Sequence, residues 1–242
     1  MGGWWISDLL SNQSINGQVW VVSWIVWVVL SICLHELAHG WAAIRLGDDT
    51  PNITGHMTWN PMVHMGGFSL VLLLILGIAW GMMPINPSRL RGRYAESLVA
   101  IAGPIMNIVL AIVALLGLII WVPLCQGQIS SGITIADPLA TNMQSFLAVG
   151  AMLNILLFVF NMLPLPPLDG SRILMNLSPA YSRFVMSDTG RWIMLGGFVL
   201  LFLIFSVFFF IFSRFVVMGI AESAWALFFS GTDTPGSKLF PF

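Results

Sequence analysis

Two histidines and a glutamate stand together at positions 35, 36 and 39, at the end of a long apolar run of the sequence. Residues four apart on an α-helix lie on one face, so His35 and His39 can both reach one metal ion. Glu36 lies about 100° further round the helix, near enough to act on a water molecule bound to that metal. These residue types in this spacing are typical of zinc-dependent hydrolysis of an amide bond.

The alternative interpretation is an exposed polar edge of a soluble helix, with the histidines bonded to neighbouring groups. The flanking residues 24–30 and 41–44 argue against it, because they read Trp-Ile-Val-Trp-Val-Val-Leu and Trp-Ala-Ala-Ile. Ionisable side chains inside such a segment are costly in a bilayer and usually functional. The motif therefore favours a site within a membrane.

The composition of the whole chain supports a membrane location. Of its 242 residues 58% are hydrophobic and 8% are charged, whereas a soluble domain has about 25% charged residues. The lipid bilayer is therefore an expected partner. A net charge of −1 leaves no basic patch for phosphates, so nucleic acid is not an expected partner. The two cysteines, Cys33 and Cys125, do not suggest a disulfide framework.

Apolar runs long enough to cross a bilayer recur along the chain. They predict helices over residues 18–44, 97–122, 146–163 and 192–212, with an additional spanning or interfacial helix over 215–229. The fold class expected is an all-α polytopic membrane protein forming one domain over residues 1–242. Within it we expect a three-helix catalytic core at about 18–172 and additional C-terminal helices at about 190–230.

Two segments between the first and second of these helices are harder to interpret. The polar segment 51–61 is unsuited to a span, and its alternation at Ile53 and at 57–59 predicts short β-structure or turns. The apolar run 68–83 has a length intermediate between a short span and a re-entrant hairpin.

The distribution of basic residues decides between the two interpretations of 68–83. If this segment enters and leaves on one side, seven of the nine lysines and arginines lie on the same face of the membrane, which the positive-inside rule makes cytoplasmic. A single crossing would separate Arg45 from the cluster at 89–93. We therefore expect a re-entrant element. The seven residues are Arg45, Arg89, Arg91, Arg93, Arg172, Arg183 and Arg191.

A zinc site needs a third protein ligand besides two histidines, and Asp169 is the candidate. It is the only carboxylate between Pro138 and Arg172, and it follows a proline-rich turn that forbids a regular helix. An irregular backbone at membrane depth is tolerated where it lines a cavity or is buried in protein. The alternative is an ordinary Asp-Gly turn at the membrane surface. The residues alone leave both interpretations open.

Three motifs taken together resemble the site-2 protease family of intramembrane zinc metalloproteases, peptidase family M50. They are His35-Glu36-x-x-His39, Gly103-Pro104-x-x-Asn107 and Asn161-x-x-Pro164-x-Pro166-x-Leu168-Asp169-Gly170, and the resemblance covers roughly residues 35–172. It implies one Zn²⁺ per chain held by His35, His39 and Asp169, with Glu36 as general base. It also implies regulated cleavage of a transmembrane protein substrate, in or near its membrane segment. The site would lie towards the cytoplasmic side of a prokaryotic cell membrane.

The sequence also departs from this family's pattern. Similar family members carry an acidic residue and a proline after the histidine that corresponds to His64, whereas this chain continues Met65-Gly66-Gly67. His64 therefore has two open interpretations, a group that assists near the site or an interfacial histidine. No room is left for a PDZ or regulatory nucleotide-binding domain, so selection of substrates by such a domain is not expected.

Several polar and small residues are candidates for secondary roles. Asn107 is a candidate donor to the tetrahedral oxyanion, or alternatively a hydrogen bond between helices. Asn154 and Asn161 lie seven apart on one face and would bind the substrate backbone or brace the proline turn. An exposed strand at 53–59 or at 66–68, the latter including Gly66 and Gly67, is expected to hold an extended substrate by strand addition.

The rival from another class is an inactive relative, or a metal-binding scaffold or transporter. A transporter needs ligands along a pathway, whereas the candidates cluster at one depth. An inactive relative would be expected to have lost Glu36 or a ligand, and none is lost. The sequence therefore favours a zinc metalloendopeptidase.

Overall fold

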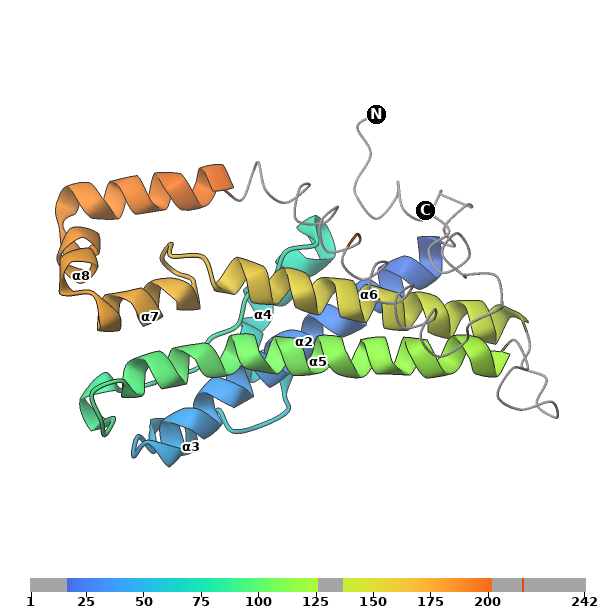
Figure 1. Ribbon diagram of the computed structural model, residues 1–242, viewed down its shortest axis with the longest axis horizontal. Helices are drawn as coiled ribbons and strands as arrows, with labels where there is room; N and C mark the ends of the chain where they lie inside the picture. Colours follow the sequence, from blue (N-terminus) through green and yellow to red (C-terminus); the bar gives the residue numbers. More distant parts are fainter. Residues whose placement is uncertain (1–16, 126–136, 202–214, 216–242) are drawn as a thin grey trace.

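The computed structural model describes residues 17–125, 137–201 and 215, and within this part of the chain the regular structure is entirely helical. A helix that carries no label in Figure 1, Asp188–Leu201, follows α8. The labelled elements are α2 (Gly17–Arg45), α3 (Thr50–Ile53), α4 (Pro61–Leu76), the 3-10 turn η2 (Pro87–Arg89), α5 (Ala95–Cys125), α6 (Asp137–Asn161), α7 (Asp169–Leu177) and α8 (Pro179–Met186).

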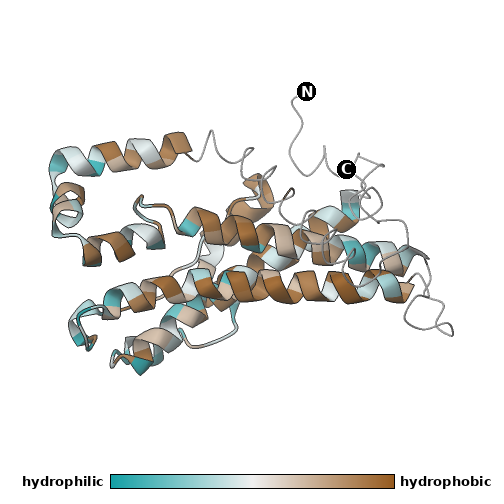
Figure 2. Cartoon of the chain, in the orientation of Figure 1, coloured by the Kyte–Doolittle hydropathy of each residue, from teal (hydrophilic) through white to brown (hydrophobic). Residues whose placement is uncertain are grey.

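Three long helices, α2, α5 and α6, lie side by side and form the body of the molecule (Figure 1). Each is long and apolar enough to cross a membrane, and Figure 2 shows hydrophobic residues along most of their length. The helices predicted over 18–44 and 97–122 are confirmed to within three residues at each end. The third begins at Asp137 rather than at 146, because Pro138 suits the first turn of a helix and polar turns precede the apolar ones.

The core lies where these three helices meet, and a glycine sets the closest approach. A Cβ at Gly150 of α6 would lie 2.1 Å from the ring of Trp27 on α2, so only glycine admits the indole. The indole Nε1 donates to the Phe146 carbonyl at 2.8 Å. Small residues at such contacts let membrane helices pack closely. The buried core includes Trp20, Val28 and Ile32 of α2, Leu110, Ala114 and Leu118 of α5, and Ala148, Val149 and Met152 of α6.

The β-structure predicted within 51–61 is wrong for this part of the chain. Ile53 ends the short helix α3, and bends follow it at 57–59. Pro51 favours a helical first turn, and the freed backbone groups pair locally, with the His56 N–H donating to the Pro51 carbonyl at 2.9 Å. An alternation of three residues cannot form a strand without a partner strand.

The region 61–86 folds back on itself. Helix α4 is kinked at Gly66, where φ is 67°, and ends at Gly77 in the left-handed conformation. Ser69 Oγ then binds both the N–H and the carbonyl of Trp80 at 2.9 Å. The Met82 N–H donates to the His64 carbonyl, also at 2.9 Å. The segment 78–86, which has no regular secondary structure, therefore lies back against α4, and the strand expected around Gly66 is wrong because that stretch is part of α4.

The C-terminal part is described as far as Leu201. Helices α8 and Asp188–Leu201 meet at a bend of 89°. The helix predicted over 192–212 therefore begins four residues earlier than expected. Its continuation over 202–214 and the helix predicted over 215–229, apart from Phe215, lie outside the described residues.

A buried carboxylate, Asp48, joins the end of α2 to the connector before α5. Its oxygens accept hydrogen bonds from the Thr50 N–H at 3.0 Å, the Thr50 hydroxyl at 2.5 Å and the Asn86 N–H at 2.6 Å. Burial alone would raise the pKa of Asp48, but these bonds and the nearby Arg89 together hold it below its ordinary value. The ionised Asp48 carboxylate therefore connects the loop after α2 to the segment before η2.

Replacing Asp48 should destabilise the protein. We expect Asp48→Ala to lower the free energy of unfolding by roughly 2–4 kcal/mol, because three donors lose a charged acceptor. Thermal unfolding in detergent measures the change. Asp49→Ala is the matched control, since the Asp49 side chain is exposed, and a change of equal size there would contradict the role of Asp48. Because the folded pKa is lowered, the contribution is complete above about pH 4 and is lost as the pH falls through the folded value.

Candidate active site

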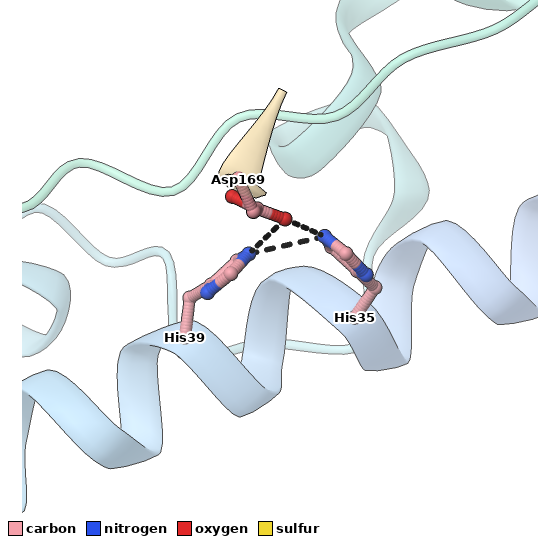
Figure 3. A group of neighbouring side chains, drawn as sticks. All are labelled: His35, His39 and Asp169. Atoms are coloured by element: carbon pink, nitrogen blue, oxygen red, sulfur yellow. Dashed lines mark hydrogen bonds and ion pairs between the residues drawn. The ribbon is translucent and has the colours of Figure 1, made fainter. Parts of the chain in front are cut away.

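Three side chains from two distant parts of the chain converge at one end of the helical body. Figure 3 shows His35 and His39 of α2 facing Asp169, which is the first residue of α7. Asp169 Oδ2 lies 3.1 Å from His35 Nε2 and 3.4 Å from His39 Nε2, and the two Nε2 atoms are 3.0 Å apart. All three side chains are buried. The structure thus brings together the three residues predicted to bind one metal.

The sequence explains how Asp169 reaches the histidines. Helix α6 ends at Asn161, and the prolines at 164, 166 and 167 prevent its continuation. The chain turns and restarts as α7 at Asp169. A Cβ at Gly170 would lie 2.3 Å from the Met162 carbonyl oxygen, so glycine lets the new helix pack directly against the turn. The Asp-Gly pair is therefore a buried helix start and not a surface turn.

The outer nitrogen of each imidazole ring faces an acceptor, so in the neutral form of the ring the inner nitrogen is the one without a proton. His39 Nδ1 lies 2.7 Å from the Val99 carbonyl, which only accepts, so Nδ1 carries the hydrogen of the neutral ring. His35 Nδ1 lies 2.7 Å from Asn107 Oδ1, and the Asn107 amide in turn donates to Asn154 Oδ1 at 3.0 Å. With both rings neutral, each Nε2 presents a lone pair.

These lone pairs provide a test of whether a cation fits the site. Asp169 Oδ2 has no hydrogen-bond donor among the described residues and faces the two Nε2 atoms, so with both rings neutral three acceptor atoms meet. Such a cluster is repulsive unless a cation lies among the atoms. Two imidazole nitrogens and a carboxylate oxygen are a ligand set that zinc accepts, with a fourth position left open for water. The donor set therefore fits zinc.

A glycine keeps space beside the ligand atoms. A Cβ at Gly103 of α5 would lie 2.4 Å from His39 Nε2 and 2.6 Å from His35 Nε2. Any larger residue would enter the volume where the ligand atoms converge. The position of this glycine in the Gly-Pro-x-x-Asn motif thus has a steric reason, which the sequence alone did not reveal.

Asn107 and Asn154 form a buried connection between the three helices. Asn107 Oδ1 accepts from His35, its amide donates to Asn154, and Asn154 Nδ2 donates to the Gly150 carbonyl at 2.9 Å. Both asparagines are fully buried. Their amides orient the His35 ring in this structure, as second partners of metal-binding histidines commonly do. The oxyanion role of Asn107 and the substrate contact of Asn154 stay predictions.

The Glu36 carboxylate lies close to His35, His39 and Asp169 and is not engaged by any described residue. It is buried, and it makes no hydrogen bond or ion pair with any residue that the structure describes. The backbone of the segment 78–86 lies against Glu36 at Gly81, where a Cβ would be 2.7 Å from Glu36 Oε1. Sequence reasoning missed Gly81, although glycines at 77 and 81 and proline at 84 signalled an interrupted helix.

The remaining predicted residues lie outside the triad. Asn161 donates to the Leu157 carbonyl at 3.0 Å and caps the end of α6, and its substrate contact stays a prediction. Gly66 and Gly67 lie at and after the kink of α4, and their substrate role is likewise untested. His64 is buried, with Nε2 2.6 Å from the Thr58 carbonyl and no partner for Nδ1 among the described residues, and both interpretations of its role stay predictions.

Filling the space at Gly103 should weaken metal binding. In Gly103→Ala, the new methyl group would collide with both ligand nitrogens, so we expect affinity for Zn²⁺ to fall at least 10–100-fold. Competition with a chelator measures this on the purified protein. Gly196→Ala is the control, because a Cβ there meets nothing within 4 Å. Equal affinities in the two variants would show that the metal lies elsewhere.

Comparison with known proteins agrees with this geometry. The model of peptidase family M50 matches residues 23–204. A Bacillus subtilis protein named "Putative zinc metalloprotease YwhC" is 33% identical over 183 residues, covering 75% of this chain and 78% of that protein. The Rip2 protein of Mycolicibacterium smegmatis, named in the same form, is 30% identical over 199 residues, covering 78% and 69%. No solved structure matches the chain. Sequence and site together place this chain in peptidase family M50.

Proposed function

We propose that this protein is an intramembrane zinc metalloendopeptidase that hydrolyses a peptide bond in or near a transmembrane segment of a protein substrate. The observation that carries the proposal is the convergence of His35, His39 and Asp169, whose ligand atoms lie within 4.8 Å of one another inside a bundle of membrane-length helices. One Zn²⁺ per chain, held by these three residues, would polarise the scissile carbonyl and make its bound water acidic. The family's metallopeptidase relatives support the same chemistry.

Glu36 is the proposed general base and acid. It lies next to His35 on α2, and its carboxylate has no competing partner among the described residues. It can therefore accept a proton from the attacking water and later deliver that proton to the leaving amine. Because the Glu36 side chain is buried, it has few other groups with which to exchange this proton before the second step.

The segment 78–86, beside Glu36, supports binding of an unwound substrate by strand addition. Between 78 and 86 the N–H groups of Trp80 and Met82 point to α4, while those of Gly81 and Met83 have no partner among the described residues. Within the described part of the chain, alternate N–H groups from 80 to 83 are thus unpaired, which is the pattern of an edge strand. A substrate helix must unwind before its amide can be cut, and an unwound segment can add to such an edge.

We also propose that the site lies towards the cytoplasm and that the region 61–86 is re-entrant. The C-terminal ends of α2 and α6 and the N-terminal end of α5 lie at the same end of the body (Figure 1). Arg45 ends α2, and the arginines at 89, 91 and 93 lie in the connector that precedes α5. Their common location supports the assignment of this end to the cytoplasmic face of a prokaryotic cell membrane.

The Glu36→Gln variant tests the catalytic assignment. The amide keeps the shape of the side chain but cannot take a proton, so cleavage of a transmembrane peptide should fall by 10²–10⁴-fold. Zinc should remain bound, because Glu36 is not one of the three ligands. Metal content and cleavage in detergent are measured on the same samples.

The chain offers a matched control for this substitution. Glu96 is exposed in the first turn of α5, so Glu96→Gln should change neither zinc content nor cleavage. Loss of zinc from Glu36→Gln would show that Glu36 is structural. A wild-type protein that binds zinc without cutting any membrane peptide would favour a metal-binding scaffold instead.

Cysteine labelling tests the re-entrant assignment. Asp49 and Ser88 are both exposed and flank the region in question, so cysteines placed there should react from the same side of sealed vesicles. A single crossing between them would separate the two positions by a bilayer core about 30 Å thick. Cys33 and Cys125 are first replaced to remove native thiols.

A third position gives the reference for the opposite face. Ser130 belongs to the segment that joins α5 to α6, so a cysteine there should react from the other side. Reaction of the cysteines at 49 and 88 from opposite sides would overturn the re-entrant assignment.

A further inference from the structure

Helix α7 carries Asp169 but is too short to hold its own position. It has nine residues, and isolated helices of this length are marginal. Its C-terminal half is tied to α5, where the Ser97 hydroxyl donates to Asn176 Oδ1 at 2.8 Å. The N-terminal end, where Asp169 lies, needs a separate attachment.

Tyr181 of α8 provides a contact on both sides of Asp169. Its hydroxyl donates to the Pro164 carbonyl at 2.7 Å and lies 3.3 Å from Ser171 Oγ. Pro164 precedes Asp169 by five residues and Ser171 follows it by two. A phenol has one proton, so the shorter contact takes it, and the Ser171 hydroxyl is then able to donate to the phenol oxygen. One hydroxyl thus joins the proline turn to the start of α7.

The local sequence of α8 places this hydroxyl. Ser178 caps the helix, its side chain accepting from the Tyr181 N–H at 3.3 Å, and Pro179 occupies the first turn. Tyr181 is therefore fixed in the first turn of α8, next to α7. The Pro164 carbonyl that it binds belongs to the proline turn, where no regular helix supplies backbone donors.

We propose that Tyr181 is a positioning residue for Asp169. By bonding the turn before Asp169 and the helix after it, the Tyr181 hydroxyl holds the carboxylate oriented towards the two histidine nitrogens. The inference rests on the proposed metal site and deepens it, since Tyr181 itself touches none of the three ligands. Its loss leaves the ligand set complete but less well ordered.

The two tyrosines of the chain allow a matched comparison. Tyr181→Phe removes the hydroxyl and keeps the ring. Tyr94→Phe removes a hydroxyl that has no partner among the described residues, while its ring continues to pack against Arg93. Full-length protein in detergent is stripped of metal and titrated with Zn²⁺ in competition with a coloured chelator. We expect Tyr181→Phe to bind Zn²⁺ about tenfold more weakly than wild type, and Tyr94→Phe to match wild type.

Two further readouts separate positioning from simple stabilisation. Co²⁺ bound to Tyr181→Phe should give a visible absorption spectrum altered from wild type, because that spectrum reports the number and geometry of the ligands. A purely structural tyrosine would lower the melting temperature of the metal-free protein and leave the Zn²⁺ affinity and the Co²⁺ spectrum unchanged. That result would overturn the proposal.

The remaining outcomes are also decisive. Wild-type protein that binds no Zn²⁺ would refute the metal site and with it the proposed function. If wild type binds Zn²⁺ and Tyr181→Phe binds it equally tightly, the positioning role is refuted and the metal site is not. If Tyr181→Phe does not fold, Ser171→Ala takes its place by removing the α7 contact of the hydroxyl. Unchanged Zn²⁺ affinity in Ser171→Ala would then overturn the proposal.

Discussion

The site depends on one electrostatic constraint, the close approach of a carboxylate oxygen and two imidazole nitrogens that carry lone pairs when the rings are neutral. In the low-dielectric interior of a helical bundle, such a cluster is strongly unfavourable without a cation. The Val99 carbonyl and the Asn107 amide bind the outer nitrogens and so direct the lone pairs inward. The glycine at 103 leaves the space that the lone pairs face. These features are explained together by a bound metal ion.

The same constraint accounts for polar residues that an apolar bundle would otherwise exclude. An unpaired amide in a membrane helix costs free energy, yet Asn107 and Asn154 are completely buried. Asn107 donates a hydrogen bond to Asn154, which in turn donates to the Gly150 carbonyl. The orientation of His35 is therefore connected to the packing of all three helices. Gly150 also admits Trp27, which brings α2 and α6 close enough for this connection. Core packing and the geometry of the site are therefore parts of one arrangement.

Much of the site could be predicted from the sequence because its chemistry is local. His35, Glu36 and His39 share one helix, and helical periodicity fixes their relation. Asp169 needed a resemblance between motifs, since nothing local states that a turn 130 residues later packs against α2. The β-structure around Ile53 was wrong because alternation over three residues does not reveal whether a partner strand exists. The partners of Asn107 and the contact of Gly81 with Glu36 arise between elements, and one sequence carries no direct signal for them.

The two histidine ligands are held more rigidly than the aspartate ligand. His35 and His39 lie within a long helix packed in the core, so their relative position is fixed without metal. Asp169 belongs to a short helix that is attached through a turn and hydroxyl contacts. Part of the free energy of binding a metal at this site would then be used to order α7 and the turn before it. By linkage, whatever orders the α7–α8 pair strengthens metal binding to the same extent that metal stabilises the pair.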